Sequence, residues 1–212
     1  MSFTPATACD LALVLAVDVS LSVDADEFAV QRDGTARALL DPGVKAALLA
    51  NGSVMLSFMQ WSGRNDHSVS VPWTRVGSPA ALQEFSAQLG RVNRGFWSET
   101  APGSAIAKAR DLHRRAPTEC ARKVIDISGD GIENTGLRTR IASENAVADG
   151  ITINGLVILG DDDRVEPFYR HNVIGGDGAF VERANGFADY PRAIRDKLLK
   201  ELPPSLAEAR LP

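Results

Sequence analysis

The sequence predicts an α/β fold in which a doubly wound, mostly parallel sheet carries helices on both faces. Short apolar runs alternate along the chain with longer segments whose apolar residues have helical spacing, and this order is typical of parallel strands joined by crossover helices. The first apolar run, Leu11 to Val17, is continuous rather than alternating. A continuous apolar run indicates a strand that is buried on both faces, as the strands of such a sheet are.

The expected strands are short runs rich in branched apolar residues, with turn residues at their ends. They are Leu11–Val17, Ser53–Trp61, His67–Val71, Lys123–Ser128, Ile151–Leu159 and Gly178–Val181. Polar and apolar residues alternate in His67–Val71, which indicates an edge or half-buried strand. Pro72 is expected to end this strand, because proline has no N–H to donate to a sheet.

The expected helices show apolar residues on one face and recognisable end signals. They are Asp24–Leu40, Val44–Leu49, Ser78–Leu89, Gly103–Arg115, Leu137–Asp149, Asp162–His171 and Pro191–Leu202. Asp24 is a suitable N-cap for the first of them, and Pro79 suits the first turn of the third. The histidines His67, His113 and His171 are scattered without metal-ligand spacing, and His113 is expected on the surface of its helix.

Length and composition favour one globular domain, and they argue against a nucleic-acid partner and a membrane span. The chain has 212 residues, of which 44% are hydrophobic and 24% charged, with a net charge of -4. No dense run of Lys and Arg is present, so nucleic acid is not an expected partner. The most apolar segment, Leu11 to Val19, is too short to cross a bilayer and contains Asp18, so no membrane span is expected.

Three segments place side-chain oxygen atoms where ligands bind in open α/β sheets, beyond the carboxyl ends of the strands. They are Asp18-Val19-Ser20-Leu21-Ser22, Ser98-Glu99-Thr100-Ala101-Pro102-Gly103 and Asp126-Ile127-Ser128-Gly129-Asp130-Gly131. Together they provide carboxylates and hydroxyl groups without histidine or cysteine. Such donors favour Mg²⁺, Mn²⁺ or Ca²⁺ over zinc or copper.

Each segment alone has a simpler interpretation. The Asp-x-Ser-x-Ser pattern equally fits a helix cap, Asp130-Gly131 fits a turn, and Thr100 fits a helix cap. Their joint position at one edge of the sheet favours the metal site. A further acidic run, Asp161 to Asp163, is interpreted as a cap on the following helix rather than as a second cation site.

Asp18-x-Ser20-x-Ser22, Thr100 and Asp130, in this order, resemble the metal-ion-dependent adhesion site of von Willebrand factor A domains. The likeness extends to a bacterial group of these proteins, the domain of unknown function DUF1194. Four further segments carry it: Trp61–Gly63, Val71–Thr74, Cys120–Gly131 and Tyr169–Gly176. The resemblance covers nearly the whole chain and implies one domain over residues 9–202, with tails at 1–8 and 203–212.

The resemblance implies a six-stranded sheet in the order 3-2-1-4-5-6 and a divalent cation at its edge. Ser20, Ser22 and Thr100 would bind the cation through hydroxyl groups, and Asp18 and Asp130 directly or through water. Mg²⁺ is the first choice, with Ca²⁺ or Mn²⁺ as alternatives, and an Asp or Glu carboxylate of a partner protein would complete the shell. Leu21 stands where many relatives have glycine, and Glu133 is expected to face water.

The same strand order makes the two cysteines interpretable. Cys9 and Cys120 would precede adjacent parallel strands, both at the edge away from the metal, so the resemblance implies a Cys9–Cys120 disulfide. A disulfide favours an exported protein, periplasmic or extracellular, and two free thiols in a cytoplasmic protein are the alternative. Residues 1–8 lack the basic and long apolar regions of a signal peptide, so such a signal is expected to be missing from the sequence as given.

The leading hypothesis for function is a non-enzymatic, metal-dependent binding module that captures a carboxylate of a partner protein. The alternative is a metal-dependent phosphohydrolase, because Asp18 follows the first strand as a phosphatase nucleophile would. However, Ser20 stands where a haloacid-dehalogenase-type phosphatase has a second carboxylate, and no general acid is evident. A Rossmann nucleotide-binding protein would need a glycine fingerprint after the first strand, which this chain lacks.

Overall fold

The computed structural model describes residues 9–202 and confirms the predicted fold class and strand order. Its six-stranded sheet has the order β3-β2-β1-β4-β5-β6. The strands are β1 (Cys9–Asp18), β2 (Val54–Trp61), β3 (His67–Val76), β4 (Cys120–Gly129), β5 (Ile151–Ile158) and β6 (Val181–Ala184). All neighbouring strands are parallel except β2 and β3. The expected tails, residues 1–8 and 203–212, lie outside the described residues.

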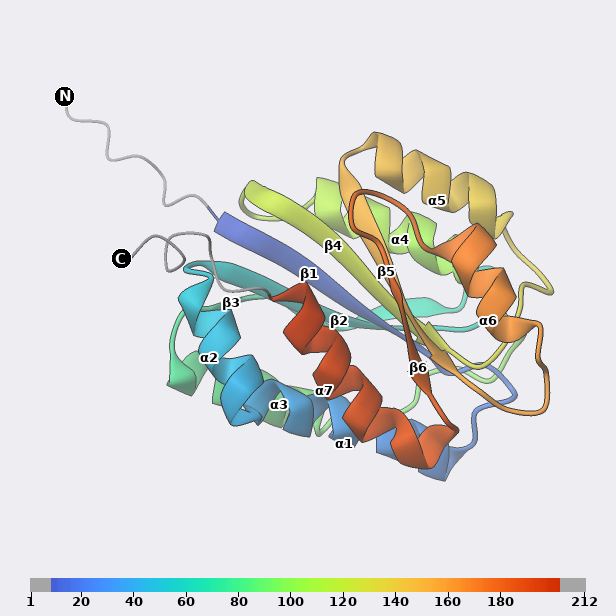
Figure 1. Ribbon diagram of the computed structural model, residues 1–212, viewed down its shortest axis with the longest axis horizontal. Helices are drawn as coiled ribbons and strands as arrows, with labels where there is room; N and C mark the ends of the chain where they lie inside the picture. Colours follow the sequence, from blue (N-terminus) through green and yellow to red (C-terminus); the bar gives the residue numbers. More distant parts are fainter. Residues whose placement is uncertain (1–8, 203–212) are drawn as a thin grey trace.

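Helices cover both faces of the sheet. They are α1 (Ala25–Leu40), α2 (Pro42–Ala50), α3 (Pro79–Leu89), α4 (Pro102–Arg114), α5 (Thr139–Ala148), α6 (Val165–Phe168) and α7 (Tyr190–Glu201). A π-helical turn, η1 (Tyr169–Val173), continues α6, and a 3₁₀ turn, η2 (Phe187–Asp189), precedes α7. Figure 1 shows α1, α2, α3 and α7 on one face, and α4, α5 and α6 on the other.

The continuous apolar run of β1 serves both faces. Leu13 and Leu15 pack into the cluster beneath α1, α2, α3 and α7, whereas Val14 and Ala16 pack into the cluster beneath α4 and α5. All four side chains are buried. Burial of a side chain of this size contributes about 1.5–3 kcal/mol, so the strand that positions the candidate site is anchored from both sides.

Two predicted strand limits were wrong. β3 continues through Pro72 to Val76, because the pairing with β2 is irregular around Ser57 and β3 is an edge strand. A bulge in an edge strand needs no N–H from proline. The last strand, expected at Gly178–Val181, starts only at Val181; Gly178 has a φ of +68°, which turns the chain instead of extending it.

The expected position of His113 was also wrong. Its side chain is buried between α4 and the sheet, and its Nε2 lies 3.1 Å from the carbonyl oxygen of Val124 on β4. Burial lowers the pKa of His113 to about 4. The histidine therefore belongs to the core as a neutral side chain, since a charged imidazole there would be poorly solvated.

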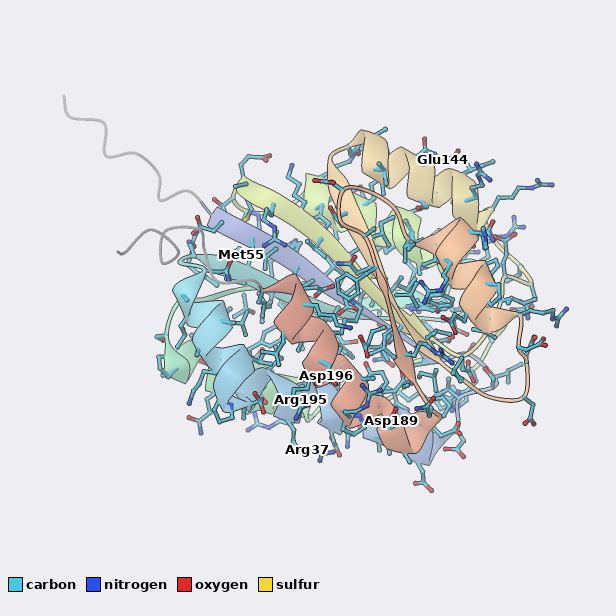
Figure 2. All side chains as sticks on the ribbon, in the orientation of Figure 1. Arg37, Met55, Glu144, Asp189, Arg195 and Asp196 are labelled. Atoms are coloured by element: carbon cyan, nitrogen blue, oxygen red, sulfur yellow. A yellow bond between two sulfur atoms is a disulfide. The ribbon has the colours of Figure 1, made fainter. Side chains whose placement is uncertain are left out.

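The implied disulfide is present between Cys9 and Cys120. The two residues are register partners on β1 and β4, and their Cα atoms lie 4.2 Å apart. With Ala12 and Met55, which is labelled in Figure 2, they form a small buried cluster at the amino-terminal end of these strands. Within residues 9–202, no helix is long and apolar enough to cross a membrane.

Candidate metal centre

Asp18 is the last residue of β1, and its side chain is completely buried. Its Oδ1 atom accepts a hydrogen bond of 2.7 Å from the backbone N–H of Ser20. The side chain of Gln31 on α1 donates to the Asp18 carbonyl oxygen at 3.1 Å. These contacts hold the carboxylate and the first residues after β1 at the carboxyl end of the strand.

Hydroxyl groups connect this segment to the end of β4. The Oγ atoms of Ser20 and Ser22 lie 3.2 Å apart. Ser22 Oγ donates a hydrogen bond of 2.8 Å to Oδ1 of Asp130, which is 108 positions later in the sequence. The structure thus brings Asp18, Ser20, Ser22 and Asp130 together at the point where β1 and β4 leave the sheet.

The segment that carries Thr100 lies at the same edge. The N–H of Leu21 donates to the carbonyl oxygen of Ser98 at 2.9 Å, which ties this segment to the one after β1. Asn134 holds Thr100 from the β4 side, since its Oδ1 accepts from Thr100 N at 2.8 Å and its N donates to Thr100 O at 3.0 Å. A Cβ placed on Gly131 would lie 3.5 Å from Thr100 Oγ1, so the hydroxyl group lies beside the Asp130-Gly131 turn.

The two carboxyl groups lie in an electrostatically unfavourable environment. Burial, and then the charge of Asp130, raise the pKa of Asp18 to about 8. Burial also raises the pKa of Asp130, although the hydrogen bond from Ser22 opposes the effect. Oδ2 of Asp18 is buried without a hydrogen-bond partner. An unpartnered buried carboxylate oxygen next to a second carboxylate fits a cation, which would supply both the missing partner and the missing charge.

The donor chemistry indicates which cations would fit this edge. Among residues 9–202, no group of three or more His, Cys, Asp or Glu side chains is arranged to hold a metal ion. A cation at this edge would therefore depend on hydroxyl and water oxygens in addition to Asp18 and Asp130. Such an all-oxygen set suits Mg²⁺, Ca²⁺ or Mn²⁺.

Arg94 supports the site, and the sequence analysis did not identify it. Its Nη2 donates to the carbonyl oxygens of Val19 at 3.1 Å and Ser20 at 2.8 Å. Its guanidinium carbon also lies 5.2 Å from the ring centroid of Trp97. Arg94 follows α3, far from β1 in sequence and outside any local motif, so only the tertiary structure reveals this role.

Ser62, directly after β2, was named only as part of a family segment, yet it holds the loop that leads to Thr100. Its Oγ accepts from Ser98 N and donates to Glu99 O, both at 3.0 Å. Its carbonyl oxygen also accepts from the N–H of Ala101 at 2.9 Å. Glu133, which was expected to face water, instead caps α5 by accepting hydrogen bonds from the N–H and hydroxyl groups of Thr139.

A cleft of about 430 Å³ opens beside the cluster. Ser22 and Asp130 line it together with Glu27 of α1, the segment after β5 and the turn before α7. Leu21, between the two serines, and Trp97, just before the Thr100 segment, have 70% and 62% of their surfaces exposed. The segments that carry the cluster therefore contribute both a cleft with acidic residues and two exposed apolar side chains.

Comparisons with known proteins agree with this architecture. Residues 8–206 match the family described as "Protein of unknown function (DUF1194)". A search of curated proteins found no match.

Three solved structures illustrate the fold. The pilus adhesin SpaC from Lactobacillus rhamnosus GG is 14% identical, with a TM-score of 0.65 over 92% of this chain and 31% of that chain. Proximal thread matrix protein 1 from the mussel byssus, with a zinc-occupied MIDAS motif, is 13% identical, with a TM-score of 0.66 over 92% of this chain and 46% of that chain. A von Willebrand factor type A protein from Catenulispora acidiphila is 16% identical, with a TM-score of 0.63 over 92% of this chain and 43% of that chain.

The chain thus spans about a third to a half of the length of these structures. At such low identity the likeness concerns the fold, whereas the family match covers nearly all of the sequence. The chain belongs to the DUF1194 family, and its fold is that of von Willebrand factor A domains.

Proposed function

We propose that residues 9–202 form a binding module that captures an Asp or Glu carboxylate of a partner protein through a divalent cation. Asp18, Ser20, Ser22, Thr100 and Asp130 would hold the cation, with Mg²⁺ as the first choice. When bound, the cation supplies the positive charge that attracts the partner carboxylate. The chain's own residues position the oxygen ligands.

The observation that carries this proposal is the convergence at one sheet edge of four oxygen-bearing side chains, one of them with an unpartnered atom. Ser20, Ser22 and Asp130 are linked by contacts of 3.2 and 2.8 Å, and Oδ2 of the buried Asp18 has no hydrogen-bond partner. A helix cap would not explain this arrangement, because Asp24 already caps α1 through a capping box with Glu27. The hydroxyl ligands add no charge and Asp18 and Asp130 at most neutralise the cation, so a coordination position that they leave open would still bind an outside carboxylate.

The surroundings of the cluster are compatible with a protein partner. Ser22 and Asp130 line an open cleft, and Leu21 and Trp97, in the segments that carry the proposed ligands, present apolar surface to solvent. Exposed aromatic and aliphatic side chains next to a polar anchor are features of protein-binding sites. Two of the similar structures are a pilus adhesin and a byssus matrix protein, and a binding role for this chain fits with them.

The proposal is tested by affinity capture of partners with the immobilised chain in Mg²⁺ and in EDTA. We expect specific partners to be retained in Mg²⁺ only, to be released by EDTA and to compete with an acidic peptide. The Asp18→Ala variant should lose this binding and keep its circular dichroism spectrum. Asp163→Ala, which removes an exposed carboxylate after β5, is the matched control and should bind normally. Binding that persists in EDTA or in Asp18→Ala would contradict the proposal.

The phosphohydrolase alternative is tested separately. Asp18 is completely buried, and its Oδ1 is occupied by the Ser20 N–H, which is unfavourable for nucleophilic attack on a phosphate ester. We therefore expect no Mg²⁺-dependent hydrolysis of p-nitrophenyl phosphate above a buffer control. Turnover that disappears in Asp18→Asn would overturn the non-enzymatic proposal.

The Cys9–Cys120 disulfide supports a further part of the proposal, that the protein works in the periplasm or outside the cell. Disulfides persist in oxidising compartments and are rare in the cytosol. The expected result is that the protein isolated from its native cells resists alkylation until it is unfolded and reduced. Two thiols that react after unfolding without reductant would favour a cytoplasmic location.

A further inference from the structure

Tyr169 is a completely buried residue whose hydroxyl group has no hydrogen-bond partner. It begins the π-helical turn η1, which the hydrogen bond from Ile174 N to Tyr169 O closes at 3.1 Å. Single π-helical turns are rare in proteins, and many of those that occur lie at functional sites. A buried phenol without a partner likewise requires an explanation, because most buried polar atoms are hydrogen-bonded.

Two glycines on neighbouring strands make room for this side chain. A Cβ on Gly155 of β5 would lie 2.9 Å from the Cδ1 atom of Tyr169, so the ring lies directly over that glycine. A Cβ on Gly129, the last residue of β4, would lie 2.5 Å from the Tyr169 hydroxyl oxygen. The ring therefore extends from β5 to the end of β4, and its hydroxyl group reaches the edge where the candidate metal ligands lie.

The unpartnered oxygen atom of Asp18 lies near this hydroxyl group. The same Cβ on Gly129 would lie 2.7 Å from Asp18 Oδ2, so the two oxygen atoms face one small space and are separated by no more than the sum of the two distances. One atom is a donor without an acceptor, and the other is an acceptor without a donor. A phenol has an ordinary pKa of about 10, so it carries its proton at neutral pH and can donate.

We propose that Tyr169 is a positioning residue of the metal centre, whose hydroxyl group donates a hydrogen bond to Oδ2 of Asp18 when a cation is bound. This inference rests on the proposed function, since it requires that a cation binds at Asp18. The hydrogen bond orients the carboxylate and stabilises its ionised form, which is the usual role of groups that surround metal ligands. In the metal-free chain the same two atoms stay unpaired.

The test compares Tyr169→Phe with wild type by calorimetric titration of Mn²⁺ and of Mg²⁺. Phenylalanine preserves the ring over Gly155 and removes only the hydroxyl group. We expect a 10- to 100-fold weaker affinity for the metal. The melting temperature of the metal-free variant should be unchanged or higher, because a buried unpartnered hydroxyl group is lost.

Tyr190→Phe is the matched control. Tyr190 is the other tyrosine of the chain, is equally buried, and lies against α1, where its hydroxyl group is 3.2 Å from Thr35 Oγ1. This variant should bind metal like wild type and melt at a lower temperature with and without metal. Equal metal affinity of Tyr169→Phe and wild type, or a loss of stability in Tyr169→Phe without metal like that of Tyr190→Phe, would overturn the inference.

A second measurement requires no change at Tyr169. With tyrosine labelled at the ring carbon that bears the hydroxyl group, addition of Mg²⁺ should shift the NMR signal of Tyr169 and leave that of Tyr190 in place. Metal binding to wild type without this shift would overturn the role of Tyr169 alone. Absence of any metal binding to wild type would overturn both this inference and the proposed function.

Discussion

The Nζ atom of Lys197 on α7 lies 2.6 Å from Oδ1 of Asp126 on β4, and solvent reaches neither side chain to a significant extent. Glu201, one turn further along α7, places Oε1 at 2.6 Å from the same nitrogen and also accepts from Asn154 of β5 at 2.9 Å. The outer side of α7 carries charged residues such as Arg195 and Asp196, labelled in Figure 2. The buried group thus joins α7 to the strand that leads to Asp130.

Replacing Lys197 by methionine should strongly destabilise the fold. The change leaves two buried carboxyl groups facing each other without the ammonium group between them, and loss of one member of a buried ion pair typically costs about 3–5 kcal/mol. Urea denaturation of the oxidised protein measures this. Lys200→Met, at a 57% exposed side chain that pairs with Glu182, is the control and should cost less than about 1 kcal/mol. Similar losses for the two variants would contradict the prediction.

Asp126 should make stability depend on pH in an unusual direction. Burial, and then the charge of Glu201, raise its pKa to about 7 against the opposing effect of Lys197. The folded state therefore binds more protons than the unfolded state between about pH 4 and 7. The contribution of Asp126 to stability is fully present below this window and falls as pH rises through it, by at most about 1.4 kcal/mol per pH unit.

The measurement is the free energy of unfolding of wild type and Asp126→Asn across pH 4–8. The difference between the two proteins should decrease as pH rises. Asp149→Asn is the control of opposite sign, because Arg110 and Arg114 lower the pKa of Asp149 to about 2. The contribution of Asp149 is lost only as pH falls below about 4, outside the window. A constant difference between wild type and Asp126→Asn would show that Asp126 does not titrate there.

Local signals were sufficient to predict most of the fold. Apolar periodicity located the strands and helices apart from β6, which shares only Val181 with its expected range, because burial on one or both faces leaves a pattern that depends on few other residues. Asp24 and Ser78 were readable as helix starts because capping involves residues only three positions away. The end of β3 was not predictable in this way, because Pro72 fits within the strand only through the irregular pairing with β2 around Ser57, a distant part of the chain.

The candidate site was predictable to the extent that its residues form short motifs. Asp18, Ser20 and Ser22 are close in sequence, the segments of Thr100 and Asp130 follow expected strands or precede a helix, and the resemblance to a known family gave each residue its role. Arg94 carries no such local signal, and Tyr169 was named only as the first residue of a family segment. Their relation to Asp18 arises from how α3 and α6 return to the sheet, and from glycines at positions 129 and 155 that matter only once a ring lies over them.

The disulfide should contribute substantially to stability. Cys9 and Cys120 are 111 positions apart, and a covalent link across so long a segment restricts the unfolded chain, with a typical effect of about 2–5 kcal/mol. The double variant Cys9→Ala, Cys120→Ala should lose this amount in urea denaturation. Reductant should lower the stability of wild type towards the same value and leave the double variant unaffected. A wild type insensitive to reductant after unfolding and refolding would contradict the prediction.

Divalent cations should stabilise the chain through Asp18, and more strongly as pH rises. At a Mg²⁺ concentration 100 times the dissociation constant, binding to the folded state alone adds about 2.7 kcal/mol, which thermal melting with and without EDTA measures. Since the metal-free pKa of Asp18 is about 8, the cation must displace a proton at neutral pH. The affinity should therefore increase between pH 6 and pH 8.

Asp18→Asn separates this effect from general ionic stabilisation. The variant lacks the buried ionisable group, so its metal-free form should be at least as stable as wild type at pH 8, and Mg²⁺ should not raise its melting temperature. Asp163→Asn removes an exposed carboxylate at the same end of the sheet and should respond to Mg²⁺ like wild type. Asp18→Asn removes the carboxylate whose Oδ2 atom is buried without a partner at the centre of the proposed ligand set. If this variant kept the full Mg²⁺ response, the cation would have to bind elsewhere.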